Sequence, residues 1–449
     1  MQQKKIFVLL LLVLSLFVLV LGRRAWAEEK EILSVEKAIE LAFDNNPLVG
    51  VAEKRVEQAR ARVREATASR APVLSASALY QEVWKDPHYP VYIGGSATAS
   101  GYALAGYRET WKTALTLSWL LYSSGSVENG IRASNLALEA VREESVRTIQ
   151  AVEHAVRLAY YELQRSRARE AVAEEAMALV KEHYRQAESL YRNGIVAKKE
   201  ILRAKVAVSE SELNLIRAAN AVDVTFRALE RAVGKTLQGE YPMPDPMDEP
   251  PAAELLADPK ERALLNRPEL RALSFSERSA KAAAASASGS KGPSIFIQGE
   301  AFSAGQTFYP DAVDDWKITA VAEWKLYDGG KAGAKRDEAL ATAGELIHRM
   351  EDMRRQIALE VSVAELDLRS ALQRLEVAKS QVDLAEEDYR MAVARYTSQV
   401  GTAVDVLDAS VSLSASKNQM VDAVYDTRKA WADMMFAIGK NIQTQEDKR

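Results

Sequence analysis

Two spacings of apolar residues recur along this chain, and each predicts a different kind of element. Strict alternation of apolar and polar residues predicts strands at about 72–82, 113–122, 293–303 and 317–327. Apolar residues three and four positions apart, with almost no Gly or Pro between them, predict helices at about 35–45, 48–70, 127–192, 198–233, 269–287, 331–396 and 402–438. The two longest helices span about 65 residues, or ~100 Å at 1.5 Å per residue, which no ordinary globular core holds.

Between these elements the composition changes. Residues 83–110 are rich in Gly, Tyr, Pro and Ser, and we expect them to form a long exposed loop, with a shorter loop at 304–315. Late in the last long helix, Leu375, Ala378, Val382 and Ala385 follow a heptad spacing with small residues, which favours close pairing with another helix. The sequence therefore predicts a mostly α protein with a small β part and coiled-coil helix packing.

The chain is one long unit written twice. The segment Trp119-Leu-Leu-Tyr-Ser-Ser-Gly125 returns as Trp324-Lys-Leu-Tyr-Asp-Gly-Gly330, 205 positions later, and the same offset relates Tyr191 to Tyr396. This period is far too long for a solenoid, so we expect one fold built from two halves. The predicted organisation is a first repeat at 28–236, a Pro-rich linker at 237–259, a second repeat at 260–439 and a polar tail at 440–449.

The N-terminus predicts export. Lys4 and Lys5 precede an apolar run at 6–21, and Ala25-Trp26-Ala27 then offers a small-x-small cleavage site. We therefore predict a signal peptide at 1–27 and a mature chain that begins at Glu28. The alternative, an uncleaved anchor, rests on the two arginines that follow the apolar run. Nothing beyond the leader is apolar for the ~18 residues that a membrane-spanning helix needs.

Composition excludes several classes of function. The chain has no cysteine, so disulfides, thiol catalysis, cysteine metal sites and lipid attachment to an N-terminal cysteine are ruled out. Its formal net charge is −4 at pH 7, which disfavours nucleic acid as a partner. The four histidines lack ligand spacing, and no phosphate loop or Ser/His/Asp pattern is present. We expect no catalytic residues, no metal site and no cofactor, so energy for any transport must come from a partner.

The strand faces indicate the environment of the sheet. Lys317 and Thr319 share one face of a predicted strand, whereas Ile318 lies on the other, a pattern typical of a membrane-barrel wall. The alternative is a half-buried strand in a soluble sandwich. In lipid, four strands would leave open edges that cannot be satisfied, so three copies would have to share a ring of twelve strands. Trp119 and Trp324 end equivalent strands, and we expect both at the periplasmic membrane interface.

An ordered set of motifs also carries a family resemblance. The members are the two Trp-x-Leu-Tyr corners, Asn46-Pro47, Arg267-Pro268, Tyr191-Arg-Asn-Gly-Ile-Val-Ala197 and Val404-Asp-Val-Leu-Asp-Ala409. Over nearly the whole mature chain, this set resembles the TolC family of outer-membrane efflux proteins. The resemblance implies a homotrimer with a twelve-stranded barrel in outer-membrane lipid and a helical tunnel across the periplasm. It also implies a passive exit duct, linked by a periplasmic adaptor to an inner-membrane pump of RND or ABC type.

Two readings of function stay open at this point. In the first, the duct serves tripartite efflux or type I secretion, and its cargo could be drugs, metals or polypeptides. The alternative is a secreted soluble coiled-coil protein with a structural or adhesive role, in which the short strands form a cap.

The resemblance further implies site residues at the periplasmic entrance. Asp405 and Asp408 match two aspartates that ring the entrance, although both residue types also simply favour a helix N-terminus. Tyr396 and Glu200 match positions that hold the entrance shut. The latch arginine of the family is replaced here by Gly401, and Lys199 could supply the missing cation, unless it is an ordinary solvated surface lysine.

The two predicted helix hairpins end in turns that the resemblance assigns to adaptor docking. The expected docking residues are Gly194, Ile195, Val196, Ala197, Val400 and Gly401. Gln399 departs from the family, which usually has Gly at this position of the second turn.

Overall fold

The structure is a computed structural model that describes residues 33–85, 87–91, 101–104, 108–237, 258–307 and 312–440. The predicted signal peptide, most of the linker and nearly all of the polar tail lie outside the described residues. The helices are α2 (Val35–Asn45), α3 (Pro47–Ala68), α4 (Ser126–Arg192), α5 (Lys198–Val233), α6 (Pro259–Asn266), α7 (Pro268–Gly289), α8 (Lys331–Thr397) and α9 (Ala403–Ala437). The strands are β1 (Val73–Glu82), β2 (His88–Val91), β3 (Gly101–Leu104), β4 (Glu109–Tyr122), β5 (Ser294–Gly305) and β6 (Val313–Glu323).

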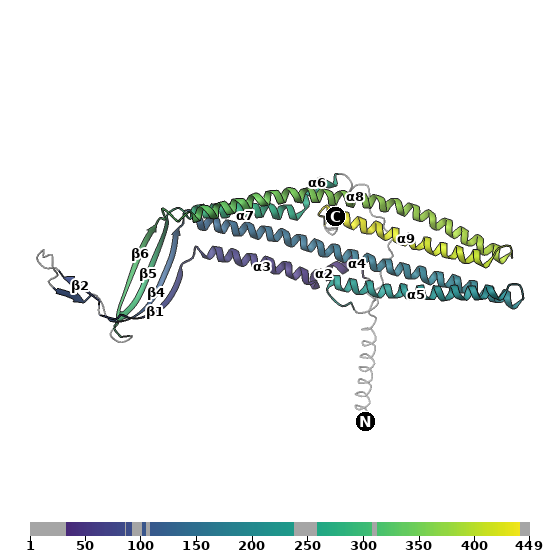
Figure 1. Cartoon of the computed structure of the whole chain (residues 1–449), viewed down its shortest axis with the longest axis horizontal. Helices are drawn as coiled ribbons and strands as arrows, with labels where there is room; N and C mark the ends of the chain where they lie inside the picture. Colours follow the sequence, from purple (N-terminus) through teal and green to yellow (C-terminus); the bar gives the residue numbers. More distant parts are fainter. Residues whose placement is uncertain are drawn as a thin grey trace, which may run out of the picture. The chain divides into compact units, whose positions relative to one another are not determined.

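This architecture confirms the expected fold class, mostly α with a small β part (Figure 1). The chain divides into two compact units, and each draws on both sequence repeats. The first unit contains the described parts of Met1–Val51, Arg147–Arg267 and Gln356–Arg449, and the second contains Ala52–Val146 and Pro268–Arg355. Both α4 and α8, each 67 residues long, contribute to the two units.

The second unit holds an antiparallel sheet in the order β1-β4-β5-β6. The first and second repeats thus contribute one half each, and β4 pairs with β5 at their junction. The edge strands β1 and β6 have no strand on their outer sides among the described residues. Part of the segment expected as a loop instead forms the small hairpin β2-β3, and β4 begins within that segment at Glu109.

The last strand is shorter at its end than its alternating sequence suggests. A strand was expected to reach residue 327, but β6 ends at Glu323. The Trp324 indole donates to the Lys291 carbonyl at 3.0 Å, and the Asp328 carboxylate accepts from the backbone N–H of Ala332 at 2.8 Å. These two contacts turn the chain toward α8 before the pleat can continue.

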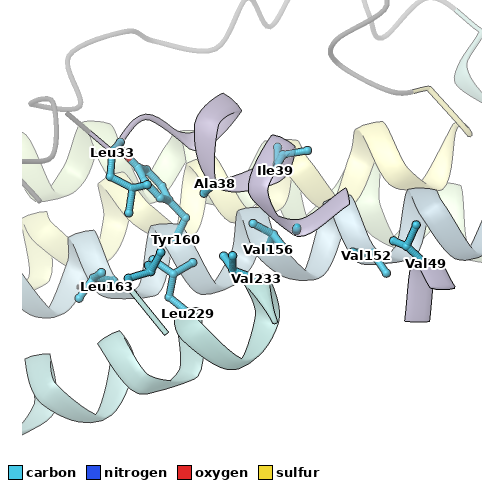
Figure 2. Close-up of a cluster of buried hydrophobic side chains, with 12 residues drawn as sticks. Leu33, Ala38, Ile39, Val49, Val152, Val156, Tyr160, Leu163, Leu229 and Val233 are labelled. Atoms are coloured by element: carbon cyan, nitrogen blue, oxygen red, sulfur yellow. Dashed lines mark hydrogen bonds between the residues drawn. The ribbon is translucent and has the colours of Figure 1, made fainter. Parts of the chain in front are cut away.

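The main core of the first unit lies where α2, α4 and α5 meet (Figure 2). Ile39 of α2 packs with Val156 and Tyr160 of α4, and Leu229 of α5 reaches the same cluster. Tyr160 is 2% exposed and donates its hydroxyl to the Leu33 carbonyl at 2.7 Å, so its polar end is satisfied. Burial of each large side chain here contributes about 1.5–3 kcal/mol.

Both repeats make the same polar contact at the start of their shorter helix. The Asn46 side-chain amide donates to the Ala232 carbonyl at 2.6 Å, at the end of α5. Arg267, the equivalent residue, donates through Nε to the Ala437 carbonyl at 2.7 Å, at the end of α9. Arg267 is 2% exposed and also pairs with Glu360 at 2.5 Å, so its buried charge is compensated.

A glycine follows each of these helix ends for a steric reason. Gly234 has φ +82, and a Cβ there would lie 2.7 Å from the Asn45 carbonyl oxygen. Gly439 has φ +72, and its Cβ would lie 3.2 Å from the Arg267 nitrogen. The repeated glycines therefore end α5 and α9 in left-handed turns and let another backbone approach closely.

Candidate functional site

The four-stranded sheet has one polar and one apolar face. Directly paired residues share a face, so Thr116, Glu300 and Lys317 lie on the same side of neighbouring strands. Glu300 accepts from Lys112 at 2.5 Å and pairs with Lys317 at 2.7 Å. The opposite face is mostly apolar, apart from a row formed by Thr113, Ser303 and Asp314. Its apolar residues are Leu74, Ala76, Ala78 and Tyr80; Trp111, Leu115, Leu117 and Trp119; Ile295, Ile297 and Ala301; and Trp316, Ile318, Ala320 and Ala322. On β1 and β6 this apolar face is exposed, which suits contact with lipid.

Aromatic residues occur near both ends of the apolar face. Tyr80 and Trp111 pair across β1 and β4 with ring centroids 4.7 Å apart, close to the start of β4. Trp119, near the end of β4, donates its indole N–H to the Arg70 carbonyl at 2.9 Å. About eight residues of strand separate Trp111 from Trp119, or roughly 27 Å, which is close to the apolar band of a membrane barrel.

At the other end of the helices, in the first unit, two hairpin turns carry the predicted docking residues. Gly194 in the α4–α5 turn has φ +74, and Gln399 in the α8–α9 turn has φ +63, so both take the left-handed conformation. The next residue in each turn is a large apolar one: Ile195 is 50% exposed and Val400 is 70% exposed. The two repeats thus present the same shape and chemistry at their tips.

The two aspartates predicted at the entrance play different parts within one chain. Both are exposed on α9. Asp405 completes a capping box with Thr402: its N–H donates to Thr402 Oγ1 at 3.2 Å, and its carboxylate accepts from the Thr402 N–H at 2.9 Å. The hydrogen bonds from Thr402 lower the pKa of Asp405, and the charge of Arg395 acts in the same direction. Asp408 lines a groove instead.

The two predicted latch residues, Tyr396 and Glu200, lie close enough to interact, and His183 contacts Tyr396. Tyr396 of α8 is 6% exposed, and its ring centroid lies 5.1 Å from that of His183 on α4. Burial raises the pKa of Tyr396, and the charge of Glu200 on α5 raises it further. Burial lowers the pKa of His183, whereas Glu200 opposes that shift. Three helices therefore place a phenol, an imidazole and a carboxylate beside one another.

Lys199, the residue expected to replace the latch arginine, lies in the first turn of α5. It lines an open groove of about 1030 Å³ between α4, α5 and α9, whose walls also include Leu202, Val206 and Asp408. Lys199 forms no ion pair with an acidic residue in the part of the chain that the structure describes. The cation beside Gly401 is Arg395: a Cβ at Gly401 would lie 3.0 Å from the Arg395 Cβ.

Sequence reasoning missed His183 and Arg395 for different reasons. His183 occupies a helix position between Val180 and Ala187, both buried, so the available signal was one polar residue on an apolar seam. No spacing in the sequence identifies Arg395 as a neighbour of Asp405, because their proximity depends on how the α8–α9 turn closes.

Among the described residues, no helix has a stretch long and apolar enough to cross a membrane. The family model described as outer membrane efflux protein matches residues 38–235 and 260–440. The chain is 23% identical to nodulation protein T of Rhizobium leguminosarum bv. trifolii, over 89% of this chain and 84% of that protein. It is 22% identical to the solvent efflux pump outer membrane protein SrpC of Pseudomonas putida, over 90% of this chain and 84% of that protein.

The fold is also similar to that of a solved channel. The crystal structure of CusC, which forms a transmembrane channel, matches with a TM-score of 0.75 at 20% identity, covering 91% of this chain and 92% of that one. At this identity the match shows the shared fold. The family match, in contrast, covers both repeats and so most of the sequence. The chain therefore belongs to the outer membrane efflux protein family.

Proposed function

We propose that three copies of this chain form a passive exit duct of a tripartite efflux system. The observation that carries the proposal is the four-stranded sheet, which has an exposed apolar face, an ion-paired polar face and two edges that no strand of the described residues covers. A free edge in lipid leaves backbone N–H and C=O groups without partners, at several kcal/mol each. Three copies that join β6 of one to β1 of the next remove all edges and enclose the polar faces as a lumen.

Exposed apolar stripes on two helices of the first unit support the same assembly. On α5 these residues are Leu202, Val206, Leu213 and Ile216, and on α8 they are Val363, Leu366, Val377, Leu384 and Met391. The α5 stripe has steps of three, four and seven residues and the α8 stripe has steps of three, seven and eleven, which are spacings of a coiled-coil seam. We infer that α5 of one copy packs against α8 of its neighbour, which would cover both stripes.

The partner at the hairpin tips is a periplasmic adaptor, which in turn joins an inner-membrane pump of RND or ABC type. The exposed Ile195 and Val400, each beside a left-handed turn residue, offer equivalent apolar contacts in the two repeats. Gly194, Val196, Ala197 and Gly401 complete these turns. A solvent efflux relative points to efflux rather than secretion, and in this proposal the pump, not the duct, selects the cargo.

The entrance is closed by Tyr396 and Glu200 and guarded by the aspartates of α9. In a trimer, Asp405 and Asp408 would gather six carboxylates round one axis, and such a ring attracts cations. Lys199 acts on this ring in the proposal, which is supported by the groove that Lys199 and Asp408 both line.

Reconstitution tests the proposal directly. The protein should require detergent for extraction from outer membranes and should behave as a trimer in light scattering corrected for detergent. In planar bilayers it should conduct ions without any added energy source. A protein that stays soluble after membranes are pelleted, or a folded monomer that does not conduct, would contradict the duct.

A further inference from the structure

Four buried polar atoms, from three residues near the tip of the first unit, have no hydrogen-bond partner among the described residues. They belong to His183, Glu200 and Tyr396, and both ring nitrogens of His183 are in this state. An unpaired buried polar atom normally costs free energy, so four such atoms at one place make this packing costly.

The three side chains come from three helices that meet near both turns. His183 lies on α4, Glu200 in the first turn of α5 and Tyr396 in the last turn of α8. His183 is only 4% exposed, and its imidazole contacts the Tyr396 ring at 5.1 Å between centroids. Tyr396 is also part of an apolar cluster with Ala392, Ala403 and Val406, which ties α8 to α9. A change at His183 therefore bears on both hairpins.

We propose that His183 is a third member of the entrance latch and makes it sensitive to acid. In its neutral form the imidazole packs against Tyr396 and holds the end of α4 against α8. When it gains a proton, a charge appears in an apolar contact, and the two hairpins separate more readily. This inference rests on the proposed latch of Tyr396 and Glu200.

The charges around His183 determine the direction of the effect. From α5 it faces Glu200, whose negative charge favours the imidazolium; from α8 it faces the neutral Tyr396. Asp405 and Asp408 on α9 are not among the charges that act on its pKa. Burial is the larger influence, so the pKa of His183 in the packed state lies below its ordinary value.

The sign of the linkage follows from that direction. A group whose pKa is lowered by packing binds its proton more readily in the open state, so acid shifts the equilibrium toward opening. Neutral His183 stabilises the closed state fully above pH ~6.5, the ordinary pKa of histidine. This contribution is lost as the pH falls below that value. Each unit of difference between the two pKa values is worth about tenfold in the ratio of open to closed channels.

Conductance in planar bilayers tests the proposal with matched variants. The wild-type channel should conduct severalfold more at pH 5.5 than at pH 7.5. His183→Gln, which keeps a polar side chain but cannot gain a proton, should remove most of this increase. His348→Gln, a control at an exposed histidine of α8, should retain the full increase. An unchanged response to pH in His183→Gln would overturn the proposal.

Two further results separate this inference from the latch itself. Glu200→Gln and Tyr396→Phe should raise conductance at pH 7.5; if neither does, the latch fails and the inference fails with it. If both variants raise conductance but His183→Gln keeps the wild-type response to pH, the latch stands and only the role of His183 in it is excluded.

A measurement on the unaltered protein guards against misfolding of the variants. Deuterium exchange at the C2 position of histidine, followed by mass spectrometry of the peptide that contains His183, reports the titration of that ring. In the closed wild-type trimer its midpoint should lie below pH ~6.5, whereas a midpoint at or above this value would contradict the proposal.

Discussion

At the scale of single residues, the two hairpin tips show how a repeat can conserve a backbone shape while changing a side chain. Gly194 and Gln399 have φ +74 and φ +63. For Gly this conformation is free of strain, but a residue with a Cβ loses about 1–2 kcal/mol in it. The sequence identified the exchange of Gly for Gln, but not that the chain still adopts the left-handed turn there.

Gln399→Gly should therefore stabilise the α8–α9 turn by about 1 kcal/mol. Slower amide hydrogen exchange in residues around the turn would report this gain. Ser398→Gly serves as the matched control, because Ser398 is not among the residues with positive φ and the added flexibility should only destabilise. Equal effects of the two substitutions would show that backbone strain at Gln399 does not lower the stability of the turn.

The aspartates of α9 have two roles: Asp405 caps the helix, and both carboxylates carry negative charge. A control variant must separate the capping role from the charge. Replacing Asp405 and Asp408 together with Ala should weaken block by divalent and trivalent ions added on the periplasmic side, and should reduce cation selectivity. Thr402→Ala is the control, because it removes the cap, at about 1 kcal/mol, but keeps both carboxylates. Unchanged block in the double Asp variant would exclude the ring.

Lys199 and the entrance latch give a separate prediction. Lys199→Ala should raise the conductance of the closed state, because it removes a positive charge from the groove that contains Asp408. Lys198→Ala, one position away at the start of α5, is the matched control and should leave conductance at the wild-type level. If both lysine variants behave like the wild type, Lys199 does not replace the arginine absent at Gly401.

At the scale of elements, helices were easier to predict than strand ends. The long helices α4 and α8 follow from stretches nearly free of Gly and Pro, a local property. The end of β6 depends instead on a contact across 33 residues, from Trp324 to Lys291, which no local pattern reveals. The hairpin β2-β3 was likewise hidden, because its segment is rich in turn residues.

The two faces of the sheet make a prediction of their own. Ile318→Lys places a charge on the apolar face of β6 and should cost about 2–4 kcal/mol if that face meets lipid near the middle of the bilayer. Thr319→Lys adds the same charge one residue along, on the polar face, and should be tolerated. Urea titration of folding into lipid vesicles would compare the two, and equal costs would argue against a lipid-facing sheet.

At the scale of the whole molecule, the sequence repeats and the compact units are two different divisions of one chain. The repeats are visible in the sequence because Gly234 and Gly439 end equivalent helices, and Asn46 and Arg267 begin equivalent ones. The units are set by packing, since each combines segments from both repeats. Contacts such as those of His183 depend on this packing, so a site partner that lies on another helix escapes prediction from sequence spacing.

The central claim is that the free edges β1 and β6 pair between copies, and the absence of cysteine makes this directly testable. Within one chain three strand spacings separate these edges, about 14 Å, which is too far for a disulfide. Any disulfide between them must therefore join two copies.

The measurement is the electrophoretic mass, after oxidation in membranes, of variants with one cysteine on each edge. Ser77→Cys combined with Thr319→Cys is the starting pair, and neighbours at two-residue steps on the same face cover the other registers. At the correct register, linked species of up to three chains should form, and reduction should return them to single chains. If every combination yields only single chains, although the protein is folded in the membrane, the trimeric duct is contradicted.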